Sequence, residues 1–246
     1  MTNKRQHSLL VAKNLTKHFG GVIAVNRVSL TVKKGEIRGL IGPNGSGKTT
    51  LINLLTNIYK PDDGEVYLNN LRIDILPAHK LIAMGIFRTF QIPKVFGNMT
   101  VLENLLVPVI SDSIGKKIEE KQDKALEILE MVQLYRLKDQ LAKNLSGGQK
   151  MLLQIARAFM LDELQLLLLD EPFAGVNPAI KELIINVLRE QNKKKGITFI
   201  VCSHELPLIS ELADKVSVMS EGKIIAEGSF EEVSSDPKVI DAYIGG

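Results

Sequence analysis

The sequence contains one cysteine and no tryptophan among its 246 residues. Cys202 alone cannot form an internal disulfide, and it is too little for a zinc site built on paired cysteines. No stretch approaches the roughly 18 consecutive apolar residues that a membrane-spanning helix requires. The first ten residues, MTNKRQHSLL, are too few and too polar for a secretory signal peptide. These absences predict a cytoplasmic protein without a transmembrane segment.

A strong net charge is also lacking. The 31 Lys and Arg residues nearly balance the 28 Asp and Glu residues, so the net charge is +3. The densest basic groups are residues 116–117 and 193–195, and the second precedes Gly196, where cations stabilise the end of a helix. Such a weak and dispersed excess does not indicate a nucleic-acid partner. Apolar residues make up 45% of the chain, which is enough for a sizeable core.

The pattern along the chain is typical of an α/β protein. Short apolar runs between turn residues predict strands, and apolar residues at helical spacing predict helices. The expected strands are residues 9–11, 23–25, 28–32, 37–41, 65–68, 166–169 and 197–202, followed by a hairpin of 215–219 and 223–226. The expected helices are residues 48–57, 119–135, 146–161, 178–195 and, with polar breaks, 229–243. We expect one domain, residues 8–246, in which a mostly helical insertion, 92–158, separates the core segments 8–91 and 159–246.

A glycine-rich loop directly after the apolar run 37–41 fits the pattern G-x-x-x-x-G-K-[ST]. Its residues, with the threonine that follows, are Gly42, Pro43, Asn44, Gly45, Ser46, Gly47, Lys48, Thr49 and Thr50. The glycines let backbone N–H groups close around a phosphate chain, and the next helix offers its positive N-terminus to the same anion. Lys48 is expected to reach the β- and γ-phosphates, and Thr49 to ligate Mg²⁺. A plain glycine-rich turn is the alternative, but the strand before and helix after favour a phosphate site.

Two adjacent acids, Asp170 and Glu171, follow the apolar run 166–169. A carboxylate at the end of a buried strand is costly unless it is paired or near a metal, so Asp170 is expected to serve Mg²⁺ directly or through water. Glu171 is placed to polarise a water for attack on the γ-phosphate. Two solvated acids at a strand end are the alternative, and the phosphate loop upstream argues against it.

A second glycine-rich helix start lies in the middle of the chain, at Ser146, Gly147, Gly148 and Gln149. Ser146 is suited to cap a helix, and the glycines leave backbone N–H groups open for a second anion. An ordinary capped helix is the alternative interpretation. One chain would then carry two anion-binding helix starts.

Together these motifs resemble those of the ABC transporter nucleotide-binding subunits, in the same order and from about residue 9 to the C-terminus. The resemblance implies an α/β fold: a P-loop NTPase core of RecA type with an antiparallel β subdomain and an inserted helical subdomain. It implies an ATPase that uses ATP and Mg²⁺, with Lys48, Glu171 and His204 as catalytic residues. Two such subunits would assemble head to tail, with each ATP between the phosphate loop of one chain and residues 146–149 of the other.

The resemblance also assigns roles to residues outside these motifs. Phe19 would stack on adenine, Gln91 would touch Mg²⁺ on the γ-phosphate side, and His204 would contact the γ-phosphate. Taken without the resemblance, the simplest interpretation of Gln91 is a polar surface residue, and that of His204 is a hydrogen-bonded core histidine. One position departs from the family: the loop 174–177 ends in Asn177, where aspartate is usual. Asn177 can cap the next helix, but it carries no charge.

Within the family, residues 85–91 (GIFRTFQ), 99–104 (MTVLEN) and 171–178 (EPFAGVNP) resemble the cassettes that import branched-chain amino acids. Three segments near the C-terminus, residues 225–228, 236–237 and 242–245, also resemble the corresponding segments of that group. The closest rival is the lipopolysaccharide-export cassette, and a soluble ABC protein acting on nucleic acid or ribosomes is a further alternative. Another alternative is a non-catalytic, nucleotide-binding regulator. Such a protein would lack Lys48, Glu171 or His204, but all three residues are present here.

The importer resemblance implies a set of partners. They are two transmembrane permease chains, a second ATPase cassette that is identical or related, and indirectly a substrate-binding protein, with no nucleic acid. The chain would then lie at the cytoplasmic face of the cell membrane. Residues 91–104 would supply much of the permease contact, because they follow the glutamine near the γ-phosphate and begin the helical insertion.

Overall fold

The computed structural model describes residues 8–109 and 118–244. The strands are β1 (Ser8–Phe19), β2 (Val22–Lys33), β3 (Ile37–Ile41), β4 (Asp63–Leu68), β5 (Leu71–Arg72), β6 (Ile86–Arg88), β7 (Leu166–Asp170), β8 (Thr198–Cys202), β9 (Lys215–Ser220) and β10 (Lys223–Gly228). The α-helices are α1 (Lys48–Leu55), α2 (Ala78–Ala83), α3 (Val101–Leu106), α4 (Ile118–Met131), α5 (Gly147–Ala158), α6 (Pro178–Lys195), α7 (Leu206–Leu212), α8 (Phe230–Ser234) and α9 (Pro237–Ile244). Short 3₁₀ turns are η1 (Val107–Val109), η3 (Tyr135–Leu137) and η4 (Ala142–Asn144).

Within the described residues, six strands form the central sheet in the order β10-β9-β3-β8-β7-β6. The strands β9, β3, β8, β7 and β6 run parallel, and β10 pairs antiparallel with β9 at one edge. After β3 the chain crosses to β6 at the far edge of the sheet. The next two strands, β7 and β8, then fill the positions between β6 and β3. The carboxyl ends of β3, β7 and β8 therefore meet at one edge of the sheet, where α/β proteins place their ligands.

The strands β3, β7 and β8 are buried along their whole length, which explains why β7 is an unbroken apolar run up to Asp170. Along β7, Leu167 and Leu169 pack into the core shared with α5, α6 and α7. The alternate residues Leu166 and Leu168 pack into a second core with α1. This alternation follows from the two-residue period of a strand.

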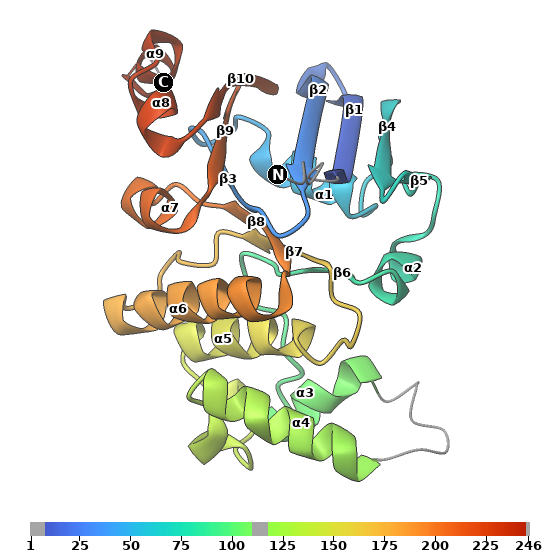
Figure 1. Cartoon of the computed structure of the whole chain (residues 1–246), viewed down its shortest axis with the longest axis vertical. Helices are drawn as coiled ribbons and strands as arrows, with labels where there is room; N and C mark the ends of the chain where they lie inside the picture. Colours follow the sequence, from blue (N-terminus) through green and yellow to red (C-terminus); the bar gives the residue numbers. More distant parts are fainter. Residues whose placement is uncertain (1–7, 110–117, 245–246) are drawn as a thin grey trace, which may run out of the picture.

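A second, antiparallel sheet of described strands has the order β2-β1-β4-β5. It covers α1, so that the helix lies between the two sheets (Figure 1). The apolar runs 23–25 and 28–32, expected as separate strands, belong to the single strand β2. The prediction was wrong here because a register shift near Arg27, whose φ is 51°, interrupts the alternation without ending the strand.

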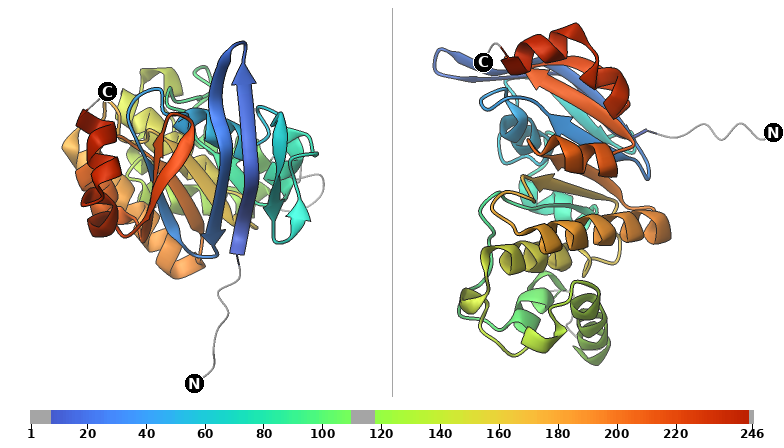
Figure 2. Two further views of the ribbon diagram at one scale, coloured as in Figure 1. Left: turned by 90° about the horizontal axis from the view of Figure 1, so that it is seen from above. Right: turned by 90° about the vertical axis from the view of Figure 1, so that its left-hand side faces the viewer.

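Helices α3, α4 and α5 form a layer beyond the central sheet, with α4 farthest from it (Figures 1 and 2). Helix α4 ends at Met131, four residues before the expected end. Gln133 has a φ of 57°, and the Leu134 N–H donates to the Leu129 carbonyl, which closes the helix. Tyr135 was expected on the apolar face, but it follows this stop and is 39% exposed.

Most other expected elements are present with small changes at their ends. The hairpin β9–β10 and the helix α6 are confirmed, and α6 begins after the Asn177 cap and ends at Gly196. The sequence pattern did not predict the short elements β5, α2, β6, α3 and α7. The basic pair at 116–117 lies outside the described residues. No helix in the described part of the chain is long and apolar enough to cross a membrane.

Candidate nucleotide site

The phosphate loop connects the end of β3 to the start of α1, and its backbone is packed too tightly for side chains. A Cβ on Gly42 would lie 2.1 Å from the Met219 carbonyl oxygen, and one on Gly47 would lie 2.3 Å from that of Ala24. Both glycines also have positive φ, 148° and 101°. Glycine is therefore required at both positions for the loop to curl against the turn after β9 and the start of β2.

Lys48 places its ammonium inside this loop. Its Nζ donates to the carbonyl oxygens of Gly42 at 2.8 Å and Pro43 at 2.9 Å, and the residue is 7% exposed. Neither partner is charged. A buried ammonium held only by carbonyls is a strong attractor for an anion entering the loop. The hydroxyl of Ser46 is buried too, and it has no hydrogen-bond partner among the described residues.

Asp170 lies at the end of β7, opposite the first turn of α1. The Thr49 hydroxyl donates to its Oδ1 at 3.2 Å, and the Arg88 guanidinium lies 3.5 Å from its Oδ2. Burial raises the pKa of Asp170, and the nearby charge of Arg88 opposes that rise. The sequence reading gave Arg88 no role at this carboxylate. A buried carboxylate beside a threonine hydroxyl offers the hard oxygen ligands that Mg²⁺ prefers.

Glu171 and His204 face one another across the carboxyl ends of β7 and β8. His204 Nδ1 lies 2.8 Å from Glu171 Oε2, and Glu171 is buried while the imidazole is about half exposed. Glu171 has a φ of 50°, held by its N–H donating to the Cys202 carbonyl at 2.9 Å. A glutamate in the left-handed region stores strain that the surrounding structure must hold in place.

Lys48, Thr49 and Glu171 line one pocket of about 460 Å³, whereas Asp170 and His204 lie behind Thr49 and Glu171 and do not line it. Its lining includes Asn44, Gly45, Gly47, Lys48, Thr49, Thr50, Gln91 and Glu171, all singled out from the sequence. It also includes residues that the sequence gave no reason to choose: Val22, Ile23, Ala24, Glu221 and Gly222. The start of β2 and the β9–β10 turn reach this pocket only through the pairing of strands that are distant in the sequence. No local motif could therefore have indicated these lining residues.

Phe19 lies at the end of β1 and is 44% exposed. Its ring meets that of Tyr59 edge to face, with centroids 5.2 Å apart. Asp62 accepts from Lys17 Nζ at 2.6 Å and from the His18 N–H at 2.7 Å, which fixes the residues just before Phe19. These hydrogen bonds lower the pKa of Asp62 to about 2. Tyr59 and Asp62 were missed because they are distant in sequence and match no motif.

The second glycine-rich helix start is built, but it lies apart from this pocket. Ser146 caps α5 with a full capping box, in which its hydroxyl accepts from the Gln149 N–H at 3.2 Å. Ser146 and Gly147 are exposed, and a Cβ on Gly147 would meet nothing within 4 Å. None of residues 146–149 lines the phosphate-loop pocket.

The loop before α6 packs beside this second helix start. A Cβ on Gly148 would lie 2.9 Å from Ile180 and 3.2 Å from Val176, so the two segments are in close contact. Asn177 caps α6 by accepting from the Ile180 N–H at 3.0 Å, as the sequence predicts. Asn177 and the start of α5 therefore lie on the same exposed side of the molecule.

Comparisons with known proteins agree with this arrangement. Residues 25–174 match the family model described as ABC transporter, and residues 223–246 match the model described as branched-chain amino acid ATP-binding cassette transporter. The chain is similar to a probable branched-chain amino acid transport ATP-binding protein LivG of Archaeoglobus fulgidus, with 43% identity over 96% of this chain and 95% of that one. It is 36% identical to the LivG protein of Escherichia coli strain K12, over 96% and 98% of the two chains.

Solved structures give the same result for the fold. A nucleotide-free ATP-binding cassette from an ABC transporter superposes with a TM-score of 0.87 and 40% identity, over 98% of this chain and 100% of that one. A cassette in its ADP conformation gives a TM-score of 0.86 and 41% identity over the same shares. Both support the P-loop NTPase fold expected from the sequence. The chain belongs to the ABC transporter family, as one of its ATP-binding, ATP-hydrolysing subunits.

Proposed function

We propose that this chain hydrolyses ATP to power the import of branched-chain amino acids through a membrane transporter. For hydrolysis, the proposal is carried by the phosphate-loop pocket, which Lys48, Thr49 and Glu171 line, with Asp170 hydrogen-bonded to Thr49 and His204 beside Glu171. For the cargo, it is carried by the match of residues 223–246 to the branched-chain amino acid cassette model and by the names of the relatives. These favour the importer over the lipopolysaccharide-export and soluble alternatives.

The residues present fit ATP with Mg²⁺. The loop amides, Lys48 and the N-terminus of α1 would hold the phosphates. Thr49, Asp170 and Gln91 would supply oxygen ligands to the ion. No group of three His, Cys, Asp or Glu side chains in the described part of the chain could hold a metal by itself. That is the usual situation for Mg²⁺, which binds through one or two protein oxygens together with substrate phosphates.

Glu171 would act as the general base that orients a water for attack on the γ-phosphate. Its carboxylate already has His204 beside it at 2.8 Å, which holds the side chain at the edge of the pocket. His204 is then placed to contact the γ-phosphate when it is present, and Phe19 to stack on the adenine. Bound Mg²⁺ would neutralise charge on the phosphates as the γ-phosphoryl group departs.

A second cassette would complete the site. The helix start at residues 146–149 has an open, exposed glycine at position 147, but it lies outside its own chain's pocket. If this helix start lay over the phosphate loop of a partner cassette, its backbone N–H groups would donate hydrogen bonds to the γ-phosphate bound there. A dimeric cassette bound to ADP and Pi is 29% identical to this chain, with a TM-score of 0.82 over 90% of this chain and 99% of that one.

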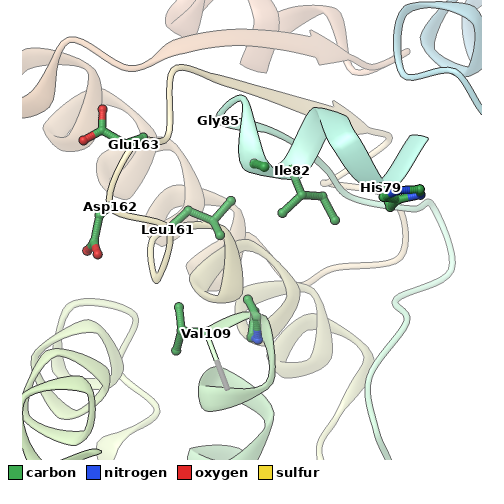
Figure 3. Close-up of a pocket in the computed structure, with 9 residues that line it drawn as sticks. His79, Ile82, Gly85, Val109, Leu161, Asp162 and Glu163 are labelled. Atoms are coloured by element: carbon green, nitrogen blue, oxygen red, sulfur yellow. The ribbon is translucent and has the colours of Figure 1, made fainter. Parts of the chain in front are cut away.

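The permease would bind along a groove beside α2 that is lined by Phe90, the residue before Gln91. The groove has two adjoining hollows, of about 290 and 490 Å³, that share His79 and Ile82 of α2; Figure 3 shows the larger one. Its surroundings carry exposed apolar residues that water does not favour: Ile58, Ile82, Ile92, Phe96 and Met99. Residues 92–158, proposed as the helical subdomain, border this groove, and 91–104 would contact the permease. The chain would thus lie at the cytoplasmic face of the cell membrane.

Purification of the tagged chain from gently solubilised membranes tests the assembly. We expect two hydrophobic permease chains and a second cassette to co-purify, with a substrate-binding protein attached indirectly. Replacing Ile82 and Ile92 by serine should release the permeases and leave ATP binding intact, since neither residue lines the nucleotide pocket. Retention of the permeases by this double variant would contradict the groove assignment.

Uptake measurements test the cargo. A deletion strain should lose most uptake of radiolabelled leucine, isoleucine and valine, and the wild-type gene should restore it. A strain complemented with Glu171→Gln serves as the matched control, because that chain should assemble but not turn over. Unchanged uptake of all three amino acids, in a strain without a redundant system, would reject the cargo and leave the ATPase assignment standing.

A further inference from the structure

An arginine beside the candidate Mg²⁺ site has no role in the proposed mechanism. Arg88 lies at the end of β6, which runs parallel to β7 and places Arg88 opposite Leu168. The Asp170 N–H also donates to the Thr89 hydroxyl at 3.3 Å, so the chain after β6 stays alongside the end of β7. This pairing of neighbouring strands brings the Arg88 side chain to the buried carboxylate of Asp170.

The two carboxylate oxygens of Asp170 have different partners. Oδ1 accepts from the Thr49 hydroxyl at 3.2 Å, and Oδ2 lies 3.5 Å from Nη2 of Arg88. The Asp170 side chain is 2% exposed and that of Arg88 is 9% exposed, so water is largely excluded from the pair. Within residues 8–109 and 118–244, Arg88 is the one cation that forms an ion pair with this carboxylate. One oxygen therefore faces Thr49, a proposed Mg²⁺ ligand, and the other faces a fixed charge.

Arg88 is held in place by groups other than Asp170. Its Nη1 donates to the side-chain oxygen of Asn53 on α1, and its Nε donates to the Thr89 carbonyl at 3.2 Å. The guanidinium also lies over the Phe90 ring, 4.5 Å from the ring centroid. The planar fork thus reaches α1 with one nitrogen and Asp170 with another. Because these contacts do not involve the carboxylate, they fix the guanidinium independently of what the carboxylate binds.

A fixed charge at Oδ2 determines how Asp170 presents Oδ1. The last torsion of an aspartate is broad, so a buried carboxylate is oriented by its partners more than by its own rotamer preference. Partners behind a metal ligand usually orient it in this way, and their loss costs about 10- to 100-fold in metal affinity or activity. Here the guanidinium holds one oxygen and leaves the other directed at Thr49, where the ion would bind.

We propose that Arg88 is a positioning residue for the Mg²⁺ site: its guanidinium, anchored on α1 through Asn53, holds the Asp170 carboxylate with Oδ1 toward Thr49. The inference deepens the proposed function and rests on its assignment of Asp170 and Thr49 to the ion. Arg88 does not line the nucleotide pocket. Its effect should therefore appear only in the part of nucleotide binding that depends on Mg²⁺.

Arg88→Met tests this, because it removes the guanidinium and keeps an unbranched apolar side chain in its place. Calorimetry gives the Kd of ADP with excess Mg²⁺ and with EDTA, and the ratio of the two values is the gain in affinity that the ion provides. We expect Arg88→Met to abolish this gain or to reduce it about tenfold, the low end of the usual range. Metal-free ADP should bind within about twofold of the wild-type value, which also shows that the variant is folded.

Arg88→Lys separates orientation from charge, and it decides the question if Arg88→Met does not fold. Lysine keeps the positive charge but has one nitrogen in place of the fork, so it cannot hold Asn53 and Asp170 together. We expect the gain to fall about three- to tenfold, the effect of losing one hydrogen bond. A wild-type gain in Arg88→Lys would overturn the proposal. Tighter MgADP binding by Arg88→Met would also overturn it, because Arg88 would then only repel the ion.

Arg157→Met is the matched control. Arg157 lines the same hollow beside α2 as Arg88, and its guanidinium lies over the Phe96 ring, 5.0 Å from the ring centroid. It also donates to a backbone carbonyl, that of Lys94 at 2.8 Å, but it forms no ion pair with a described residue. The same substitution there should lower the Tm through lost packing and leave the Mg²⁺-dependent gain at the wild-type value. An equal loss of this gain in both variants would overturn the proposal, because packing in the hollow would then explain it.

Asp170→Asn separates failure of this inference from failure of the proposed function. If Asp170→Asn keeps the wild-type gain, the ion site itself is wrong, and the role of Arg88 fails with it. If Asp170→Asn loses the gain while Arg88→Met keeps it, only the role of Arg88 is rejected.

Discussion

The two glycine-rich helix starts of this chain differ in how much of their surroundings the chain itself supplies. At the start of α1, Lys48 and Asp170 are buried, and groups from four strands close around the loop. At the start of α5, Ser146 and Gly147 are exposed, and their capping contacts come from the same helix turn. Both offer N–H groups to an anion, but only the first adds a cation and a carboxylate.

The contrast supports the proposal that one chain binds nucleotide and that a second chain completes the site for hydrolysis. The α1 site has the charges for binding phosphate and Mg²⁺. The α5 site is rigid and open, and a rigid open donor set suits a ligand that another molecule presents. Changes at α1 should therefore act on a single chain, and changes at α5 should act only when two chains meet.

The largest effect is expected from Glu171→Gln. Loss of a general base lowers turnover by about 10²- to 10⁴-fold, while the isosteric amide leaves the phosphate contacts in place. Steady-state hydrolysis should nearly vanish, ATP affinity should persist, and an ATP-bound dimer should accumulate on size exclusion. Hydrolysis close to the wild-type rate would remove Glu171 from the base role.

Gly147→Asp should break the second site alone. The added carboxylate faces the position of the partner's γ-phosphate, and disruption of such a donor set costs about 10²-fold or more in turnover. Nucleotide affinity of the single chain should not change. Gly147→Ala is the matched control, because a Cβ there meets nothing within 4 Å. Normal hydrolysis by Gly147→Asp would show that α5 does not face nucleotide in this protein.

Ser146→Arg should also leave ATP binding by the single chain intact and block hydrolysis, because its long side chain fills the space in front of the start of α5.

Gly148→Ala should behave differently from both of these variants. Its Cβ would press on Ile180 at 2.9 Å, so it should lower the Tm of the single chain. The two neighbouring glycines thus distinguish an interface position from a packing position.

Lys48→Ala should break the first site and leave the second intact. Removing the ammonium loses charge-assisted hydrogen bonds to phosphate, which corresponds to about a ten- to hundredfold loss of ATP affinity by calorimetry. Lys194→Ala, at the exposed end of α6, controls for loss of one positive charge. ATP affinity equal to that of the control would contradict the phosphate assignment.

The same contrast shows what could be read from the sequence. The phosphate loop, the acidic pair and the cap at Ser146 are local strings whose chemistry is fixed by spacing, and the structure builds each where it was expected. The expected Mg²⁺ and γ-phosphate contacts of Gln91 and His204 stay predictions, although Gln91 lines the nucleotide pocket and His204 contacts Glu171, which also lines it.

What the sequence could not reveal depends on contacts between distant segments. Asp62 fixes the residues before Phe19 from 44 positions away, and Arg88 meets Asp170 across 82 positions. Tyr243 packs against the central core because α9 folds back along β10. Within β2, the irregularity at Arg27 divides the apolar alternation in two, so the local pattern missed a strand that long-range pairing preserves.

The smallest effects are expected at Asn177, which lies beside the open α5 site. Its side chain caps α6, so Asn177→Ala should cost about 1 kcal/mol. For a chain of this size that corresponds to a Tm lower by about 2–4 °C. Single-chain ATP affinity should stay at the wild-type value, because Asn177 does not line the pocket. Weaker ATP binding by this variant would mean that the two sites are coupled within one chain.

Asn177→Asp restores the aspartate that the family usually has, and it isolates the role of charge. A carboxylate accepts the same hydrogen bond from the Ile180 N–H and adds a favourable interaction with the α6 dipole of about 0.3–1 kcal/mol at low salt. The Tm should rise by up to a few degrees in low salt, and the gain should shrink as salt screens the charge. If the charge matters only to the fold, hydrolysis by the assembled pair should stay at the wild-type rate. A changed rate, with the same Tm gain, would instead show that the neutral asparagine tunes how two cassettes meet.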